Sequence, residues 1–134
     1  MGVDAKATLR MSDWKEELYQ DEATAIKLAK ADSIATFSGD IEGSGVAQWL
    51  LAYPEGVPAT FVGFQSVTGK VSGRSGSFVL KMTGTYESDT ADVSWSVVPG
   101  SGTGELEGLA GEGGYRAPLG TTDLPVTLNY TVER

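Results

Sequence analysis

The chain has 134 residues, with 10 Lys and Arg against 18 Asp and Glu, which gives a formal net charge of −8 and a pI near 4.4. It contains no cysteine and no histidine, which excludes disulfides, thiolate metal sites and every histidine-dependent catalytic triad. The acidic balance argues against nucleic acid as a partner, and no apolar run approaches the roughly 20 residues of a membrane helix. We therefore expect one cytoplasmic domain over residues 1–134, with neither nucleic acid nor membrane as its partner.

The N-terminal part begins with a strand and continues into an ambiguous stretch. Apolar and polar residues alternate over Ala5–Met11, which is typical of a strand. Asp13 followed by Glu16 resembles a helical capping box, so a short helix over Asp13–Gln20 is one interpretation. Because few apolar residues mark a buried face there, a loop or an extended arm is an equal alternative.

Three strand-like runs follow this stretch. The first covers Ile26–Ile41 and leads into GDIEGSG, which we interpret as a turn because its glycines can adopt positive φ. The second covers Val46–Tyr53 and is apolar on both faces, which predicts a strand buried on both sides. The third covers Ala59–Val71.

The clearest element is a central hairpin. Period-two alternation runs over Ser77–Thr83 and again over Asp92–Val97, with turn-forming residues at Ser88–Thr90 between them. Trp95 alternates with serines and lies between two valines, so we expect its side chain inside the protein.

The C-terminal part combines a glycine-rich stretch with two more strands. We interpret Gly100–Gly114 as a loop that closes one end of the fold, with one helical turn near Glu105–Leu109. Strands are expected from Tyr115–Ala117 and over Val126–Val132. A phosphate-binding role for the glycines is disfavoured, because a full helix does not follow them and their glutamates oppose phosphate.

About eight strands without a convincing core helix predict an all-β protein. Such a chain must close its sheet or cover its edges, so a single closed antiparallel barrel is the economical solution. A two-sheet sandwich is the alternative. A barrel of eight strands is either filled by side chains or wide enough for one small ligand.

Aromatic residues interleaved with glycine, alanine and serine permit an apolar cavity inside the barrel, and a barrel filled by side chains, with glycines at its corners, is an equal alternative. The ligand-binding candidates share a place on the predicted strands: Trp49, Tyr53, Phe61, Gln65, Phe78, Met82 and Trp95. The catalytic candidates are Glu42 and Glu112, as bases at a barrel mouth, and the hydroxyl of Tyr115. No ladder of oxygen ligands appears, so neither a metal nor a cofactor is expected.

Four segments carry a resemblance to a known family. FSGDIEGSG at residues 37–45, FVGFQSVTG at 61–69, SGRSGSFVL at 72–80 and WSVVPGSGTGELEGLAGEGG at 95–114 resemble the DUF3224 family of small bacterial proteins of unknown function. The resemblance implies a closed, calycin-like barrel similar to that of the allene oxide cyclases. It also favours an extended arm over a helix at Asp13–Gln20. Relatives usually carry a histidine where this chain has Met82, so chemistry that depends on that histidine is not shared.

These observations leave two leading functions and leave open whether the protein is an enzyme. The first is a barrel that binds a small apolar molecule between aromatic walls. The second is a cofactor-independent isomerase or cyclase acting on an apolar substrate, as the resemblance to allene oxide cyclases implies. A structural or interaction role is a third alternative, and the apolar residues of Val46–Tyr53 permit a homo-oligomer.

Overall fold

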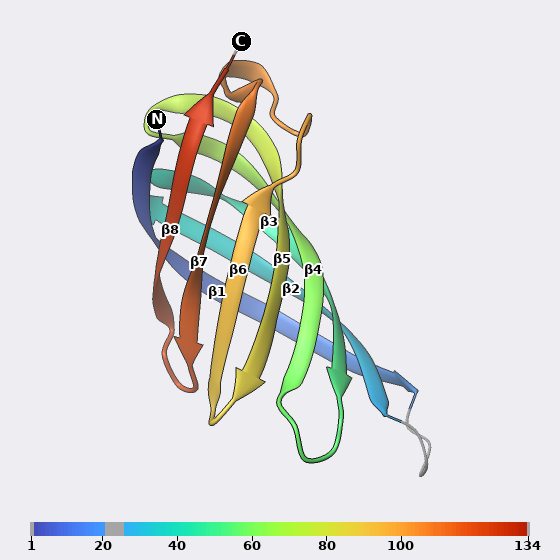
Figure 1. Cartoon of the computed structure of the whole chain (residues 1–134). Helices are drawn as coiled ribbons and strands as arrows, with labels where there is room; N and C mark the ends of the chain where they lie inside the picture. Colours follow the sequence, from blue (N-terminus) through green and yellow to red (C-terminus); the bar gives the residue numbers. More distant parts are fainter. Residues whose placement is uncertain (1, 21–25, 134) are drawn as a thin grey trace.

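The structure is a computed structural model that describes residues 2–20 and 26–133. Its described residues form eight strands: β1 (Val3–Gln20), β2 (Lys27–Gly39), β3 (Ile41–Tyr53), β4 (Ala59–Val71), β5 (Arg74–Glu87), β6 (Thr90–Val97), β7 (Leu109–Pro118) and β8 (Asp123–Val132). Each strand pairs antiparallel with the next, and β8 pairs with β1 to close the barrel (Figure 1). The prediction of an all-β closed antiparallel barrel is therefore confirmed, and the sandwich alternative is wrong. The likeness to allene oxide cyclases stays a prediction.

The central hairpin is formed by β5 and β6, as the alternation predicted. Thr83 faces Ser94 in the register, and Ser88 and Asp89 form the turn with φ of 53° and 60°. Two successive residues with positive φ give the twist that joins antiparallel strands tightly. The same alternation directs Met82 and Trp95 inward, where both side chains are buried.

The ambiguous stretch after Met11 is strand rather than helix. Ser12 pairs with Ile34 and Lys15 pairs with Asp32, so β1 carries an extra residue, and Asp13 has a φ of 54°. Such a bulge bends a strand and shifts its inward-facing positions by one. Beyond the bulge, β1 and β2 form an arm that extends past the other strands at the lower right of Figure 1. The extended alternative was correct, and the helix was not.

Two other expectations need correction. Val46–Tyr53 is not buried on both sides, because Val46 and Leu50 are exposed on the outer face while Trp49 is buried. The glycine run from Gly111 to Gly114 is not a loop but part of strand β7. Glycine has no side chain, so this run shows no alternation from which a strand could be recognised.

One end of the barrel is closed and the other is open. Residues 98–108 fold over the closed end with a 3-10 turn, η1 (Gly104–Leu106), whose Leu106 is fully buried. The Thr103 N–H donates to the Ser77 carbonyl at 2.9 Å and fixes this cover to β5. This part of the loop prediction is confirmed. In the described part of the chain, no helix has the length and apolar character needed to cross a membrane.

Candidate ligand site in the barrel mouth

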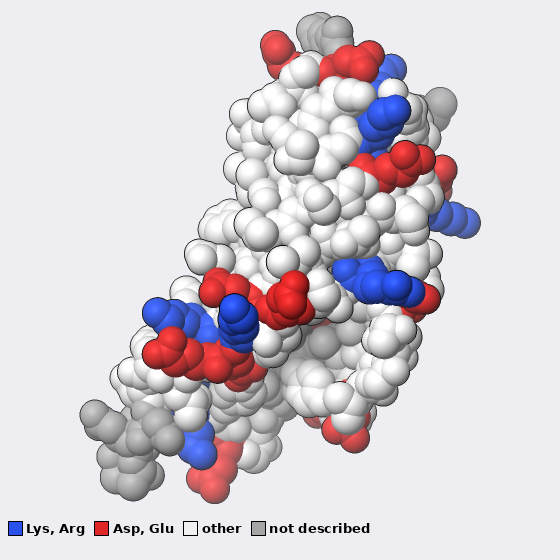
Figure 2. Space-filling view, turned by 180° about the vertical axis from the view of Figure 1, so that it is seen from behind, with Lys and Arg blue, Asp and Glu red and all other residues white. Residues whose placement is uncertain are grey.

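The open end of the barrel contains a cavity of about 520 Å³. Residues from every strand except β2 line it, together with the β7–β8 turn. The surface is hollowed near its lower end in the view from behind (Figure 2). A cavity of this size is in the range that holds a small organic molecule. We call it the mouth cavity.

Its inner wall is built around Trp49 and Phe61. The ring centroids of the two side chains are 5.3 Å apart at 78°, an edge-to-face arrangement that aromatic rings favour. Trp49 Nε1 donates to Ser33 Oγ at 3.1 Å, so its polar atom is already paired. Phe61 faces Gly84 across β4 and β5, where a Cβ would come within 2.5 Å of the Phe61 ring. The missing side chain at Gly84 therefore makes room for this ring.

The rim is organised by Glu16 on the β1 arm. Its Oε2 accepts a hydrogen bond from the Tyr53 hydroxyl, and its Oε1 accepts one from Trp14 Nε1 at 3.1 Å. Trp14 also lies against Trp49, with ring centroids 6.0 Å apart. Burial raises the pKa of Tyr53 above its usual value, and the hydrogen bond to the Glu16 carboxylate raises it further. Tyr53 is therefore a neutral donor at the rim over the physiological range of pH.

Tyr115 on β7 lies at the inner side of the mouth cavity. Its ring packs against Trp95 with centroids 5.0 Å apart, and Trp95 Nε1 in turn donates to the Thr127 carbonyl at 2.9 Å. Burial raises the pKa of Tyr115, because an ionised phenolate in an apolar environment loses its solvation. The hydroxyl therefore stays protonated.

The structure brings some predicted site residues together and separates others. Of the sequence-predicted residues, Trp49, Tyr53, Phe61 and Tyr115 line the mouth cavity. Four other candidates are buried but do not line it: Gln65, Phe78, Met82 and Trp95. Trp95 is internal, as predicted, and its ring packs beneath Tyr115. The ligand-binding and catalytic roles of all these residues stay predictions.

Glu42 and Glu112 do not lie at the mouth. Glu42 follows the β2–β3 turn at the closed end and pairs with Lys70 in the register. Glu112 is exposed on the outer face of β7. Neither carboxylate lines the mouth cavity, so the structure gives neither of them access to a ligand bound there.

The sequence interpretation missed Met11, Trp14 and Glu16 as cavity residues. All three line the mouth cavity, and the last two do so because the bulge at Asp13 shifts the inward positions of β1 from odd to even numbers. A strict period-two interpretation fails at such a point. The sequence does carry a signal for this part of the site. Trp14 and Glu16, an aromatic and an acidic residue two positions apart, directly follow Asp13, a residue type that tolerates the positive φ of a bulge.

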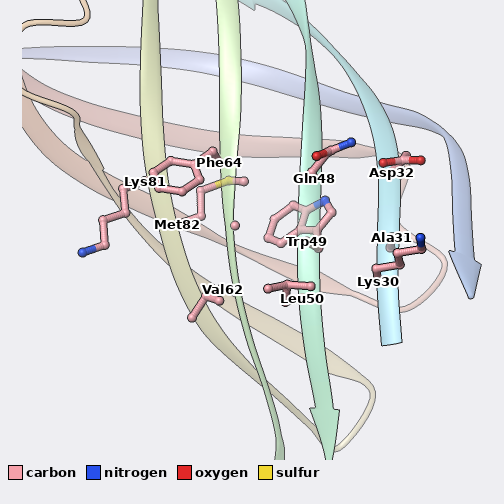
Figure 3. Close-up of a pocket in the computed structure, with 11 residues that line it drawn as sticks. Lys30, Ala31, Asp32, Gln48, Trp49, Leu50, Val62, Phe64, Lys81 and Met82 are labelled. Atoms are coloured by element: carbon pink, nitrogen blue, oxygen red, sulfur yellow. The ribbon is translucent and has the colours of Figure 1, made fainter. Parts of the chain in front are cut away.

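A second hollow lies on the outside of the barrel. This outer groove, of about 590 Å³, is lined on its exposed side by Leu50, Val62 and Phe64 (Figure 3). Lys30 on β2 and Lys81 on β5 lie at its two sides. The groove is a depression across the outer face of β2–β5, whereas the mouth cavity is lined by residues of seven strands.

The described residues contain no group of three or more carboxylates that could hold a metal ion. Glu16 is the single acidic residue among the described residues that line the mouth cavity. The chemistry that this site offers is therefore apolar contact, hydrogen bonding by tyrosine and one carboxylate at the rim.

Comparison with known proteins places this barrel in a family. The model of a family described as "Protein of unknown function (DUF3224)" matches residues 5–130. The chain is similar to a protein of unknown function from the DUF3224 family of Shewanella oneidensis MR-1, known from its crystal structure. The two are 25% identical over 100% of both chains, with a TM-score of 0.75. No curated protein matches the chain. The chain therefore belongs to the DUF3224 family.

Proposed function

We propose that this protein binds a small, largely apolar molecule in the mouth cavity. The observation that carries the proposal is the mouth cavity itself: about 520 Å³ of space walled by Trp49, Phe61 and other apolar side chains, in a barrel whose other end is closed. Burying apolar ligand surface against such walls contributes roughly 25 cal/mol per Å² before the costs of association are subtracted.

Blocking the mouth cavity from inside tests this function. Ala117 on β7 lines the cavity, so Ala117→Trp would place a large ring in the space that a ligand needs. Ala110 lies on the same strand with its side chain exposed, so Ala110→Trp is the matched control. We expect the neutral dye N-phenyl-naphthylamine to bind the unmodified protein and the control, and to lose at least about tenfold in affinity for Ala117→Trp.

Equal dye affinity for all three proteins would contradict the proposal, and so would no binding to any of them. Thermal melting of both variants establishes that they are folded. Should Ala117→Trp fail to fold, Ala91→Phe blocks the same cavity from the neighbouring strand, because Ala91 faces Ala117 in the register.

A second function, cofactor-independent isomerisation or cyclisation, is favoured by one contact. Glu16 and Tyr53 form a hydrogen-bonded carboxylate and hydroxyl at the edge of the apolar mouth cavity. Such a pair can take up and return a proton while the cavity shapes a flexible substrate. If Glu16→Gln abolishes turnover of an apolar molecule but retains its binding, that result would support this function. Unchanged turnover in the same variant would contradict it.

A further inference from the structure

The hydroxyl of Tyr115 is the feature of the mouth cavity that no contact within the protein uses. Tyr115 is 8% exposed, and among the described residues its hydroxyl has no hydrogen-bond partner. The other aromatic polar atoms around the cavity are paired: Trp14 and Tyr53 with Glu16, Trp49 with Ser33, and Tyr86 with Asp89. A buried hydroxyl without a partner destabilises the folded protein if it is sealed from every acceptor.

The Tyr115 hydroxyl is not sealed, however. Among the described residues, every side-chain nitrogen or oxygen that is closed off from solvent has a hydrogen-bond partner. Because the Tyr115 hydroxyl has none, it must face open space, and the mouth cavity is the space that Tyr115 lines. The result is one donor that points into an otherwise apolar part of the cavity.

The charges around the cavity restrict what this donor can meet. Among the described residues that line the cavity, none is Lys or Arg, and Glu16 is the one acidic residue. A ligand carboxylate would therefore lose its hydration without meeting a cation, and it would pass a negative rim on entry. Burial also raises the pKa of Tyr115, so its hydroxyl keeps the proton that it would donate.

We propose that Tyr115 determines specificity in the mouth cavity by donating a hydrogen bond to the carbonyl oxygen of a neutral, otherwise apolar ligand such as a ketone or an ester. This proposal rests on the proposed function, since it names the ligand chemistry of the same site. The carbonyl end of the ligand lies inward at Tyr115, and its apolar body lies between Trp49, Phe61 and the rim.

Three probes of equal chain length test the proposal by competition with the neutral dye: a medium-chain methyl ketone, the corresponding alkane and the corresponding fatty acid at neutral pH. We expect the unmodified protein to bind the ketone more tightly than the other two. Tyr115→Phe should lower the affinity for the ketone by about two- to tenfold and leave the affinity for the alkane unchanged.

Tyr130→Phe is the matched control, because Tyr130 is also a buried tyrosine but does not line the mouth cavity. It should leave the ketone affinity unchanged. Infrared spectroscopy of a ketone labelled at its carbonyl gives a second measurement: the carbonyl stretch should move to lower frequency on binding, and Tyr115→Phe should remove that shift.

The outcomes separate this proposal from the proposed function. Ketone affinity and carbonyl frequency that do not change in Tyr115→Phe would overturn the role of Tyr115, while leaving apolar binding intact. Tighter binding of the fatty acid than of the ketone would overturn the assignment of a neutral ligand. A protein that binds neither dye nor alkane would contradict the proposed function itself.

Discussion

The Tyr53 hydroxyl on β3 donates a hydrogen bond to Glu16 Oε2 on β1, and this contact spans β2 at the rim of the mouth cavity. The two strands are not neighbours in the sheet, because β2 lies between them. The other oxygen of Glu16 accepts a hydrogen bond from Trp14, whose ring lies against Trp49. One carboxylate thus fixes the β1 arm over the side of the cavity.

Tyrosine ionisation should weaken the fold at alkaline pH. Burial raises the pKa of both Tyr53 and Tyr115 in the folded state above the usual 10.0. The folded protein therefore holds these protons at a pH where the unfolded chain releases them, so the free energy of unfolding falls as pH rises above about 10. Below about pH 9 both tyrosines are protonated in the folded and the unfolded state, so they add no pH dependence to the free energy of unfolding. Urea denaturation at a series of pH values measures this dependence.

The variants Tyr53→Phe and Tyr115→Phe should each make the alkaline loss of stability less steep, since phenylalanine has no proton to release. Tyr19→Phe is the control, because Tyr19 is exposed. A pH dependence that is identical in all three variants and the unmodified protein would contradict this explanation.

Trp95 should contribute far more to stability than Trp14 does. Its side chain is 3% exposed, packs against Phe37 and Tyr115, and donates to the Thr127 carbonyl. Trp95→Ala should lower the free energy of unfolding by about 3–5 kcal/mol. Trp14 is 44% exposed, so Trp14→Ala should cost far less stability while reducing dye affinity at the rim. Urea denaturation measures both losses. Similar losses of stability in the two variants would contradict the prediction that Trp95 contributes more to stability than Trp14.

The sequence predicted this barrel best where its strands alternate without interruption. The β5–β6 hairpin, with Trp95 inside, follows directly from its period-two pattern. The arm could not be assigned in the same way, because the bulge at Asp13 changes which residues of β1 face inward. The strand at Gly111–Gly114 escaped prediction for a different reason, since glycines carry no side chains to show a pattern.

The candidate site was predictable only in part. Alternation shows that Phe61 and Phe78 face inward, but it does not show how far along the barrel each one lies. That position depends on which end the loop at residues 98–108 covers. Trp49, Tyr53 and Phe61 were placed at the open end by the fold, whereas Phe78 was placed away from the cavity.

Gly84 should tolerate no side chain. A Cβ there would lie 2.5 Å from Cζ of Phe61 and 2.2 Å from the carbonyl oxygen of Asp92, and the second contact involves backbone that cannot easily move. Gly84→Ala should therefore lower the free energy of unfolding by about 1–3 kcal/mol and disturb the cavity wall at Phe61. Thr85→Ala, on the exposed face of the same strand, is the control for thermal melting. A Gly84→Ala protein as stable as this control would refute the packing argument.

Gln65 should affect stability more than ligand affinity. Its side chain is 2% exposed, its Nε2 donates to the Ser66 carbonyl at 2.8 Å, and it does not line the mouth cavity. Gln65→Leu should lose about 1 kcal/mol through this hydrogen bond and leave dye affinity unchanged. A clear change in affinity, with the fold intact, would instead support the sequence-based assignment of Gln65 to the ligand.

The most direct test of the central claim is to locate a bound apolar molecule by NMR. Backbone amide signals of the isotope-labelled protein would be followed during titration with the methyl ketone. The largest shifts should occur at residues that line the mouth cavity, such as Phe61, Tyr115 and Ala117. Shifts concentrated instead at Leu50, Val62 and Phe64 in the outer groove, or no shifts at all, would contradict ligand binding in the mouth cavity.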